Sequence, residues 1–180
     1  EMGYVPFVTT GWSPIEDTVA NRAKIVETRE AAGLPTDEVP FAAQVYVHVT
    51  DSKEDALVAA DNARYVRRIA MSMRGQYAEL DGAFLIEAPA EGEPPLETIV
   101  QNALIGSPEK IAEQLIARIK AWKPTHLNTF HAPGNIPHKK VMGSIERFMT
   151  EVVPLVEKEL GPLSKLGAPV PAGPRALAAE

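Results

Sequence analysis

The chain has 180 residues with a formal net charge of −6, and 45% of its residues are hydrophobic and 23% are charged. This composition is that of a folded domain, and an acidic balance without a block of Lys and Arg argues against nucleic acid or an anionic membrane as the main partner. Small-molecule chemistry or protein contact remains. There is no cysteine, no stretch of about 18 apolar residues and no basic-then-apolar leader, so we expect a cytoplasmic protein without disulfides or thiolate metal sites.

The first expected elements are a strand over residues 5–10 and a helix over residues 14–32. Ser13 is the expected N-cap of this helix, and Glu16, three residues later, completes a capping box. The strand begins so close to the first residue that we expect a preceding helix to have been cut off. We therefore expect the chain to be a piece of a longer domain.

A second strand is expected over residues 41–49, followed by a helix over residues 53–73 that Asp51 or Ser52 caps. Apolar and polar positions alternate along the strand, with Val45, Val47 and Val49 on one face and Gln44, Tyr46 and His48 on the other. This pattern favours a barrel strand whose valine face packs on helices and whose polar face approaches a ligand. A half-exposed edge strand is the alternative.

Residues 74–102 are crowded with Pro and Gly, which predicts an inserted loop that is either a lid over a site or disordered. Ser107, Pro108 and Glu109 then begin a helix that ends at Lys123. Its first turn is a poor phosphate cradle, because Glu109 would repel an anion there.

The third strand is expected over residues 125–131 and the last helix over residues 137–160, with Pro154 as a candidate kink and a flexible Pro/Ala-rich tail over residues 161–180. The loop and the start of this helix carry Asn135, His138, Lys139 and Lys140. Cations oppose the helix dipole at this end, so the residues form an anion-attracting loop or their long side chains extend into water. Water is the favoured interpretation.

Strands that alternate with helices predict a parallel sheet, either open and doubly wound or part of a (β/α)8 barrel. Three strands leave exposed sheet edges, so further strands are expected to pair with them. His48 and His131 lie at strand ends, but no acid partner or metal-ligand spacing accompanies them, which favours pocket lining over a general-base role. Trp12 either stacks on an aromatic cofactor or covers the start of the first helix.

Three segments together carry a resemblance to a known family: VYVHVTDSKEDA, LIGSPEKIAEQL and THLNTFHAPGNIPHKKVMGSIERFMTEVVPLV. They resemble the C-terminal part of the bacterial luciferase-like flavin-dependent monooxygenases, in which a Gly-(Ser or Thr)-Pro-Glu helix precedes the last barrel strand. Ser144, Ile145, Phe148 and Val153-Pro154-Leu155 match the family's final helix. The resemblance implies an α/β fold in which residues 1–160 supply strands six to eight of a (β/α)8 TIM barrel, with the insertion near the active-site mouth.

The resemblance also implies an activity, in which reduced FMN from a separate flavin reductase reacts with O2 and oxygenates a small organic substrate. It implies Thr10 and Trp12 as cofactor-binding residues and a substrate pocket formed by Tyr46, His48, Asn128, Phe130 and His131. The family's best-known catalytic histidine, most flavin-phosphate contacts and the homodimer interface would lie in earlier strands, so this chain alone is expected to be inactive. A deazaflavin hydride-transfer enzyme, a non-catalytic half-barrel subunit and an open sheet binding an acidic ligand at residues 134–140 are the alternatives.

Overall fold

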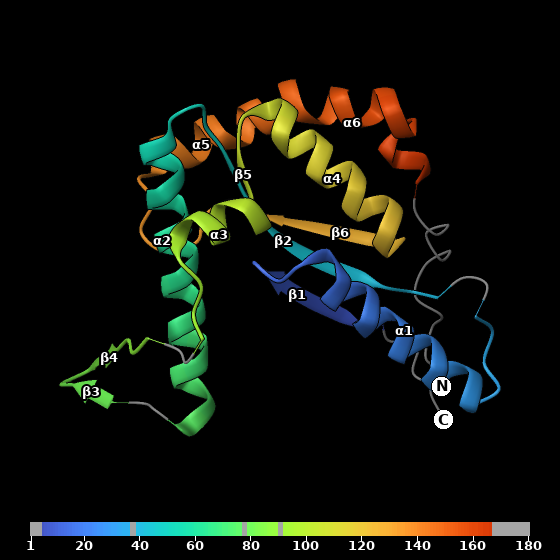
Figure 1. Ribbon diagram of the computed structural model, residues 1–180, viewed down its shortest axis with the longest axis horizontal. Coiled ribbons are helices and arrows are strands. Elements are labelled where there is room, and N and C mark those ends of the chain that lie inside the picture. Colours follow the sequence, from blue (N-terminus) through green and yellow to red (C-terminus); the bar gives the residue numbers. More distant parts are fainter. Residues whose placement is uncertain (1–4, 37–38, 77–78, 90–91, 167–180) are drawn as a thin grey trace, which may run out of the picture.

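The computed structural model describes residues 5–36, 39–76, 79–89 and 92–166. Its centre is a four-stranded parallel sheet formed by β1 (Phe7–Gly11), β2 (Ala42–Val49), β5 (Leu104–Gly106) and β6 (His126–Phe130) (Figure 1). The β2 strand pairs with β1 and β6 along its first half and with β5 at its last residues. Because β2 has neighbours on both sides, the edge-strand interpretation of this segment is wrong.

The helices lie close to where their sequence patterns predict them. Their bounds are α1 (Ile15–Ala31), α2 (Lys53–Met71), α3 (Leu96–Asn102), α4 (Pro108–Trp122), α5 (His138–Arg147) and α6 (Val153–Leu160). The last two are joined by a π-helical segment, Phe148–Val152, just before Pro154. Since proline has no N–H to donate to the preceding turn, the helix widens there, at the position of the expected kink.

Two of the three expected helix caps form. The Ser52 Oγ accepts a hydrogen bond from the N–H of Asp55 at 3.2 Å, and the Ser107 Oγ accepts one from the N–H of Lys110 at 3.4 Å. The capping box at Ser13 is wrong, because Pro14 takes the N-cap position and no side chain caps α1. Ser13 instead closes the turn after β1, where its N–H donates to the carbonyl of Thr10 at 2.9 Å.

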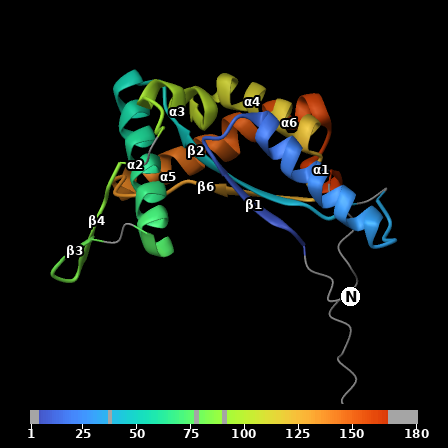
Figure 2. The same cartoon turned by 60° about the horizontal axis from the view of Figure 1, so that its bottom comes forward.

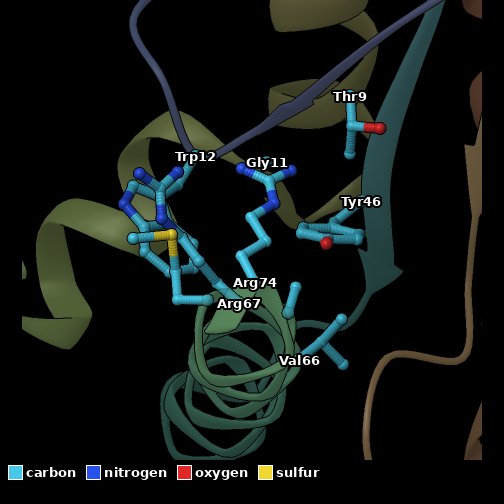
Figure 3. Close-up of a pocket in the computed structure, with 9 residues that line it drawn as sticks. Thr9, Gly11, Trp12, Tyr46, Val66, Arg67 and Arg74 are labelled. Atoms are coloured by element: carbon cyan, nitrogen blue, oxygen red, sulfur yellow. The ribbon is translucent and has the colours of Figure 1, made fainter. Parts of the chain in front are cut away.

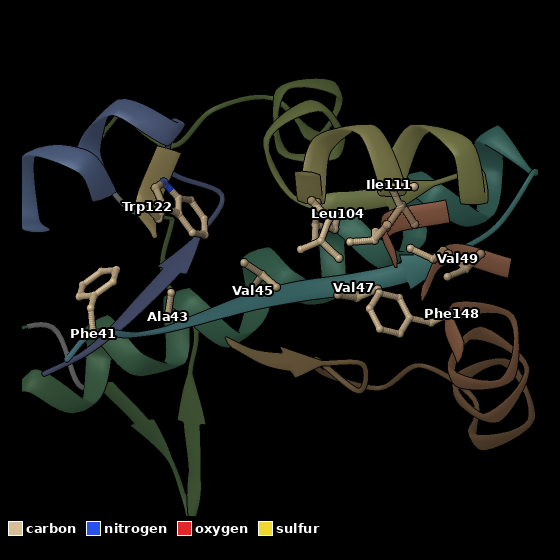
Figure 4. Close-up of a cluster of buried hydrophobic side chains, with 13 residues drawn as sticks. Phe41, Ala43, Val45, Val47, Val49, Leu104, Ile111, Trp122 and Phe148 are labelled. Atoms are coloured by element: carbon tan, nitrogen blue, oxygen red, sulfur yellow. The ribbon is translucent and has the colours of Figure 1, made fainter. Parts of the chain in front are cut away.

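One face of the sheet packs on helices, and Figure 2 shows α1, α4 and α6 together on that side. The valine face of β2 forms the core there with β5, α4 and the π-helical segment (Figure 4). The buried side chains include Val45, Val47, Val49, Leu104, Ile111, Trp122 and Phe148. The period-two alternation of β2 thus marks the buried face correctly.

The segment predicted to be an inserted loop is largely regular structure. It contains a π-helical turn, Ser72–Gln76, the antiparallel pair β3 (Glu79–Asp81) and β4 (Phe84–Ile86), and α3. Prolines that suggested a loop instead begin a helix, with Pro95 at the N-cap of α3. The short strand β5 was not expected, because three residues are too few to show a period.

The helix that directly follows β2 in the chain, α2, does not cover the valine face of β2. It stands at the carboxyl end of the sheet, and the helix that returns the chain across the valine face is α4 (Figures 1 and 2). The small side chains of Ala59, Ala60 and Ala63 let α2 approach Tyr46 closely. The helix α2 therefore closes the carboxyl ends of the strands.

The opposite face of the sheet is uncovered along most of its length by the described elements (Figure 2). Thr9 and Gln44 are register partners there, and Gln44 and Asn128 are register partners on the other side. Thr9 and Asn128 are exposed and Gln44 is half-buried. This polar face leads to the carboxyl ends of the strands, where α2 begins.

The end of the chain follows its prediction only in part. Leu163–Lys165 form a short 3₁₀ turn inside the segment expected to be a flexible tail. Residues 167–180 lie outside the described residues. None of the helices in the described part of the chain is both long and apolar enough to cross a lipid bilayer.

Candidate functional site

The carboxyl ends of β1 and β2 and the last turns of α2 enclose a pocket of about 210 Å³, which we call the arginine pocket. Figure 3 shows two arginine side chains extending from α2 and its π-helical continuation toward Trp12 and Gly11, with one guanidinium between Trp12 and Tyr46 and the other overlapping Trp12 in this view. The residues that line the pocket include Thr9, Gly11, Trp12, Tyr46, Arg67 and Arg74. Gly11 has a φ of +55°, a conformation that residues with a Cβ rarely adopt, and this sharp turn brings Trp12 to the pocket.

The aromatic side chains of the arginine pocket are held firmly. Trp12 and Tyr46 are both buried, and the Arg67 guanidinium lies 4.9 Å from the centroid of the Trp12 ring, in cation–π contact. One face of Trp12 is therefore already occupied. Burial raises the pKa of Tyr46, and the nearby positive charge of Arg67 opposes this effect without cancelling it.

Arginines on the same helical segment fall into two groups. Arg64 pairs with Asp61, and Arg68 forms a two-point ion pair with Glu93, its Nε 2.8 Å from Oε2. Within the described residues, Arg67 and Arg74 form no ion pair. The arginine pocket therefore concentrates positive charge that no described carboxylate neutralises.

A second group of charged side chains, which we call the histidine cluster, lies between the end of β2 and the start of α2. The His48 Nε2 lies 2.9 Å from Asp55 Oδ2, and Lys140 of α5 donates to the other carboxylate oxygen of Asp55. Burial alone would raise the pKa of Asp55, but the bonds from Lys140 and His48 outweigh it and bring the pKa down to about 2. The expectation that His48 has no acid partner is wrong, because α2 begins directly above the end of β2.

His131 completes the histidine cluster from the end of β6. Its ring meets Phe148 edge-on, with centroids 5.1 Å apart, and burial together with the nearby His48 lowers the pKa of His131 to about 4. The Nδ1 atoms of both histidines are buried without a hydrogen-bond partner in the described structure. Asp55 thus holds the His48 ring at Nε2, and the His48 Nδ1 atom is left without a described partner.

Of the other expected pocket residues, Asn128 and Phe130 lie with Tyr46 on the polar face of the sheet, whereas Thr10 is buried. The Thr10 hydroxyl donates to the carbonyl of Gln44 at 2.8 Å, which ties β1 to β2. Asn128 donates to the Gln44 side-chain oxygen at 3.0 Å, and the Phe130 ring lies 5.6 Å from that of Tyr46. Tyr46, Phe130 and Asn128 thus form one surface, although their role in binding stays a prediction.

The loop after β6 is fixed to α2. The N–H of Asn135 donates to Asn62 Oδ1 at 2.5 Å, and Gly134, with a φ of +64°, leaves no room for a Cβ beside the same oxygen. Asn135 also borders a cavity of about 560 Å³ whose walls include the acidic Asp61 and Glu87, which disfavour an anion. An anion site formed by Asn135 stays a prediction.

The three cations at the start of α5 have different surroundings. Lys140 meets the carboxylate of Asp55, so the expectation that it extends into water is wrong. His138 and Lys139 are exposed and form no ion pair with another described residue. Among the described residues, Lys140 alone of the three is therefore balanced by a carboxylate, that of Asp55, which the sequence did not single out.

Sequence reasoning missed Asp55, Arg67 and Arg74. Arg67 and Arg74 are seven residues apart, a spacing that places both on one face of a helix, and this signal was available. Asp55 lies in the first turn of α2, where a carboxylate is common because it favours the helix dipole. Its pairing with Lys140, 85 residues away, had no local signal.

Comparison with known proteins identifies relatives of the chain. The family model described as luciferase-like monooxygenase matches residues 3–124, more than half of the chain. An uncharacterized protein, y4vJ of Sinorhizobium fredii (strain NBRC 101917 / NGR234), is 31% identical over 103 residues, which are 56% of this chain and 29% of that protein.

Solved structures share the fold at low sequence identity. The monooxygenase RslO1 from Streptomyces bottropensis aligns with a TM-score of 0.56 and 14% identity over 84% of this chain and 42% of its own. Riboflavin lyase RcaE, in a structure with modified FMN and the substrate riboflavin, aligns with a TM-score of 0.53 and 15% identity over 92% of this chain and 41% of its own.

A third structure is the oxygenating constituent of 3,6-diketocamphane monooxygenase from the CAM plasmid of Pseudomonas putida, a type II Baeyer–Villiger monooxygenase in complex with FMN. It aligns with a TM-score of 0.54 and 18% identity over 85% of this chain and 43% of its own. The chain spans less than half the length of each of these relatives. The match to the family model nevertheless covers most of the parallel sheet and the arginine pocket, and the chain belongs to the luciferase-like monooxygenase family.

Proposed function

We propose that the chain forms one wall of the active site of a flavin-dependent monooxygenase, which uses reduced FMN and O2 to oxygenate a small organic substrate. The observation that carries the proposal is the convergence of polar and aromatic side chains at the carboxyl ends of parallel strands, where barrel enzymes hold their active sites. The family match supports the same reaction class.

In the proposed whole protein, β1, β2 and β6 are strands six to eight of a (β/α)8 barrel. Helices cover the valine face of β2, as they cover the outside of a barrel, whereas the face with Gln44 and Asn128 is polar and largely uncovered, as a barrel interior would be before the other strands are added. The parallel pairing of β1, β2 and β6 in this order also supports it.

The residues of this wall fit part of a flavin site. Tyr46 and Phe130 offer an aromatic surface and Asn128 a side-chain donor, all on the face proposed to be the barrel interior. When bound, reduced FMN supplies the electrons that activate O2. FMN named in two of the structural relatives favours it over a deazaflavin.

The histidine cluster has a proton-handling role in this proposal. Asp55 holds the His48 ring at Nε2, and the buried Nδ1 atom, which has no described partner, is the proposed site of proton exchange with the substrate. Burial keeps His131 neutral at physiological pH, so it lines the same space without adding charge. Exclusion of water by α2, which covers the strand ends, protects such a step.

The test uses the natural gene product that contains these residues. Photoreduced FMN is mixed with air-saturated buffer, and flavin absorbance follows reoxidation with and without the protein. We expect the protein to bind FMN and to change the reoxidation time course, and we expect His48→Gln to alter that time course while FMN binding persists. Absence of FMN binding, or binding of a deazaflavin only, would refute the proposal.

A separate reductase as the source of reduced FMN, a homodimer of the whole protein and a cytoplasmic location are parts of the same proposal. Co-purification and size-exclusion chromatography of the natural gene product test the first two, and cell fractionation tests the third.

A second candidate is a non-catalytic half-barrel that binds another chain through its sheet. The uncovered polar face supports it, as does Phe7 at the start of β1, whose side chain is 54% exposed on this face. A discrete complex with a second polypeptide that leaves FMN reoxidation unchanged would favour this alternative.

A further inference from the structure

We infer that the arginine pocket binds the anionic group of a small aromatic substrate, a carboxylate or sulfonate attached to a single ring. This inference rests on the proposed function, because it names the class of substrate that the site would take. Neither the family match nor the similar structures assign a role to the two arginines.

The arginine pocket holds positive charge that no described carboxylate pairs with. Arg64 and Arg68 on the same helix each face a carboxylate, whereas Arg67 and Arg74 face Trp12, Gly11 and Tyr46 without one in the described structure. Arg67 and Arg74 line the same small pocket, and like charges in one small space repel each other. An anionic ligand group that accepts hydrogen bonds from both removes this repulsion.

Two aromatic side chains, Trp12 and Tyr46, form walls of the arginine pocket. The buried rings of Trp12 and Tyr46 lie on either side of one arginine guanidinium, and both arginines line the same pocket as the two rings (Figure 3). Arg67 is held over Trp12 at 4.9 Å, so its planar donors are oriented before a ligand arrives. A flat ring can therefore lie against Tyr46 while its acid group reaches the guanidinium groups.

The size of the pocket limits the ligand. About 210 Å³ is less than the roughly 300 to 1,000 Å³ of ordinary small-molecule sites, so the pocket holds one part of a ligand rather than a whole flavin. The phosphate of FMN is carried by a flexible ribityl chain, far from the flavin ring. A pocket that combines aromatic walls and cations in one small space fits an acid group attached directly to a ring.

Two tryptophans provide a built-in readout for the test. Trp12 lines the pocket, whereas the indole N–H of Trp122 donates to the carbonyl of Ile15 at 3.1 Å in the buried core. The ¹⁵N-labelled 180-residue chain is titrated with benzoate and with its neutral isostere benzamide, and both indole N–H signals are followed by NMR. Benzoate should shift the Trp12 signal to saturation, benzamide should bind about tenfold more weakly, and the Trp122 signal should stay in place.

Variants test the two guanidinium groups directly. Arg67→Gln and Arg74→Gln should each weaken benzoate binding about tenfold and leave benzamide binding unchanged. Arg64→Gln is the matched control on the same helix, because the charge of Arg64 is met by Asp61, and benzoate binding should stay the same. Arg67→Lys should recover part of the affinity, since it restores the charge but not the planar donors.

The outcomes separate this inference from the proposed function. Equal binding of benzoate and benzamide, or full affinity in both glutamine variants, would overturn the anion site. If FMN shifts the Trp12 signal at lower concentration than benzoate and riboflavin does not, the anion is the flavin phosphate and the substrate assignment is wrong. None of these titrations depends on flavin oxidation, so failure here leaves the FMN reoxidation test of the proposed function intact.

Discussion

Replacement of Asp55 by asparagine tests the charge network that joins α2, β2 and α5. The substitution keeps the shape of the side chain but removes the negative charge that faces His48 and Lys140. Folding lowers the pKa of Asp55 from 3.8 to about 2, which corresponds to roughly 2 kcal/mol of stabilisation at neutral pH. Because the Lys140 side chain is 51% exposed and screened by water, we expect Asp55→Asn to cost about 1 to 2 kcal/mol.

The pH dependence of this cost follows from the sign of the shift. The pKa of Asp55 is lower in the folded state, so its stabilisation is complete above the unfolded value and is lost as the pH falls through the folded value. About half of the effect should remain at pH 3, and little below pH 2. The difference between wild type and variant isolates Asp55, since every other titrating group is common to both.

The assay is urea unfolding at pH 7 and pH 3, followed by the fluorescence of the buried Trp12 and Trp122. Glu54→Gln is the matched control, because Glu54 occupies the same helical turn but is exposed and has no ion pair within the described residues. The control should change stability by less than about 0.5 kcal/mol. Equal stability of wild type and Asp55→Asn at pH 7, or a difference that is the same at both pH values, would refute the reasoning.

Further predictions concern buried groups and one turn. Gly134→Ala forces a φ of +64° on a residue with a Cβ and brings that atom 2.4 Å from an amide oxygen of α2, so a loss of about 2 kcal/mol or more is expected in urea unfolding. Folding lowers the pKa of His131 from 6.5 to about 4, so the folded state binds fewer protons in this window and stability should fall as the pH drops. Between pH 7 and pH 5 the wild type should lose up to about 2 kcal/mol more than His131→Gln, and parallel pH profiles would contradict this. Ser144→Ala leaves a buried N–H of β2 without its acceptor at 2.9 Å and should cost about 1 to 3 kcal/mol, whereas Ser13→Ala, which removes no cap bond, should be nearly neutral in the same measurement.

The local elements were readable from the sequence because their signals lie in short windows. The alternation of Val45, Val47 and Val49 with polar residues identified both the strand and its buried face. Ser52 and Ser107 marked helix starts through caps that involve residues only three positions away. Ser13 misled because an extended Pro14 displaced the helix start by one residue, which is within the usual uncertainty of helix boundaries.

The candidate site was readable only in part. Trp12, Tyr46, His48 and His131 follow or end strands, and parallel strands bring their carboxyl ends to one edge of the sheet, so their proximity could be expected. The charged side chains that surround these residues could not be expected from the sequence. Asp55 looked like an ordinary residue of a helix start, until the position of α2 showed it between His48 and Lys140.

The sequence by itself determined the α/β class, the order of the long elements and the resemblance to the luciferase-like family, because hydrophobic periods, caps and family motifs are contiguous in the chain. Only the tertiary structure decided that α4, rather than α2, covers the valine face, and that α2 instead closes the strand ends. Packing between segments far apart in sequence sets that choice, and with it the contacts of Arg67 with Trp12 and of Lys140 with Asp55. The anion-binding character proposed for the site therefore depends on where one helix docks, which no local pattern specifies.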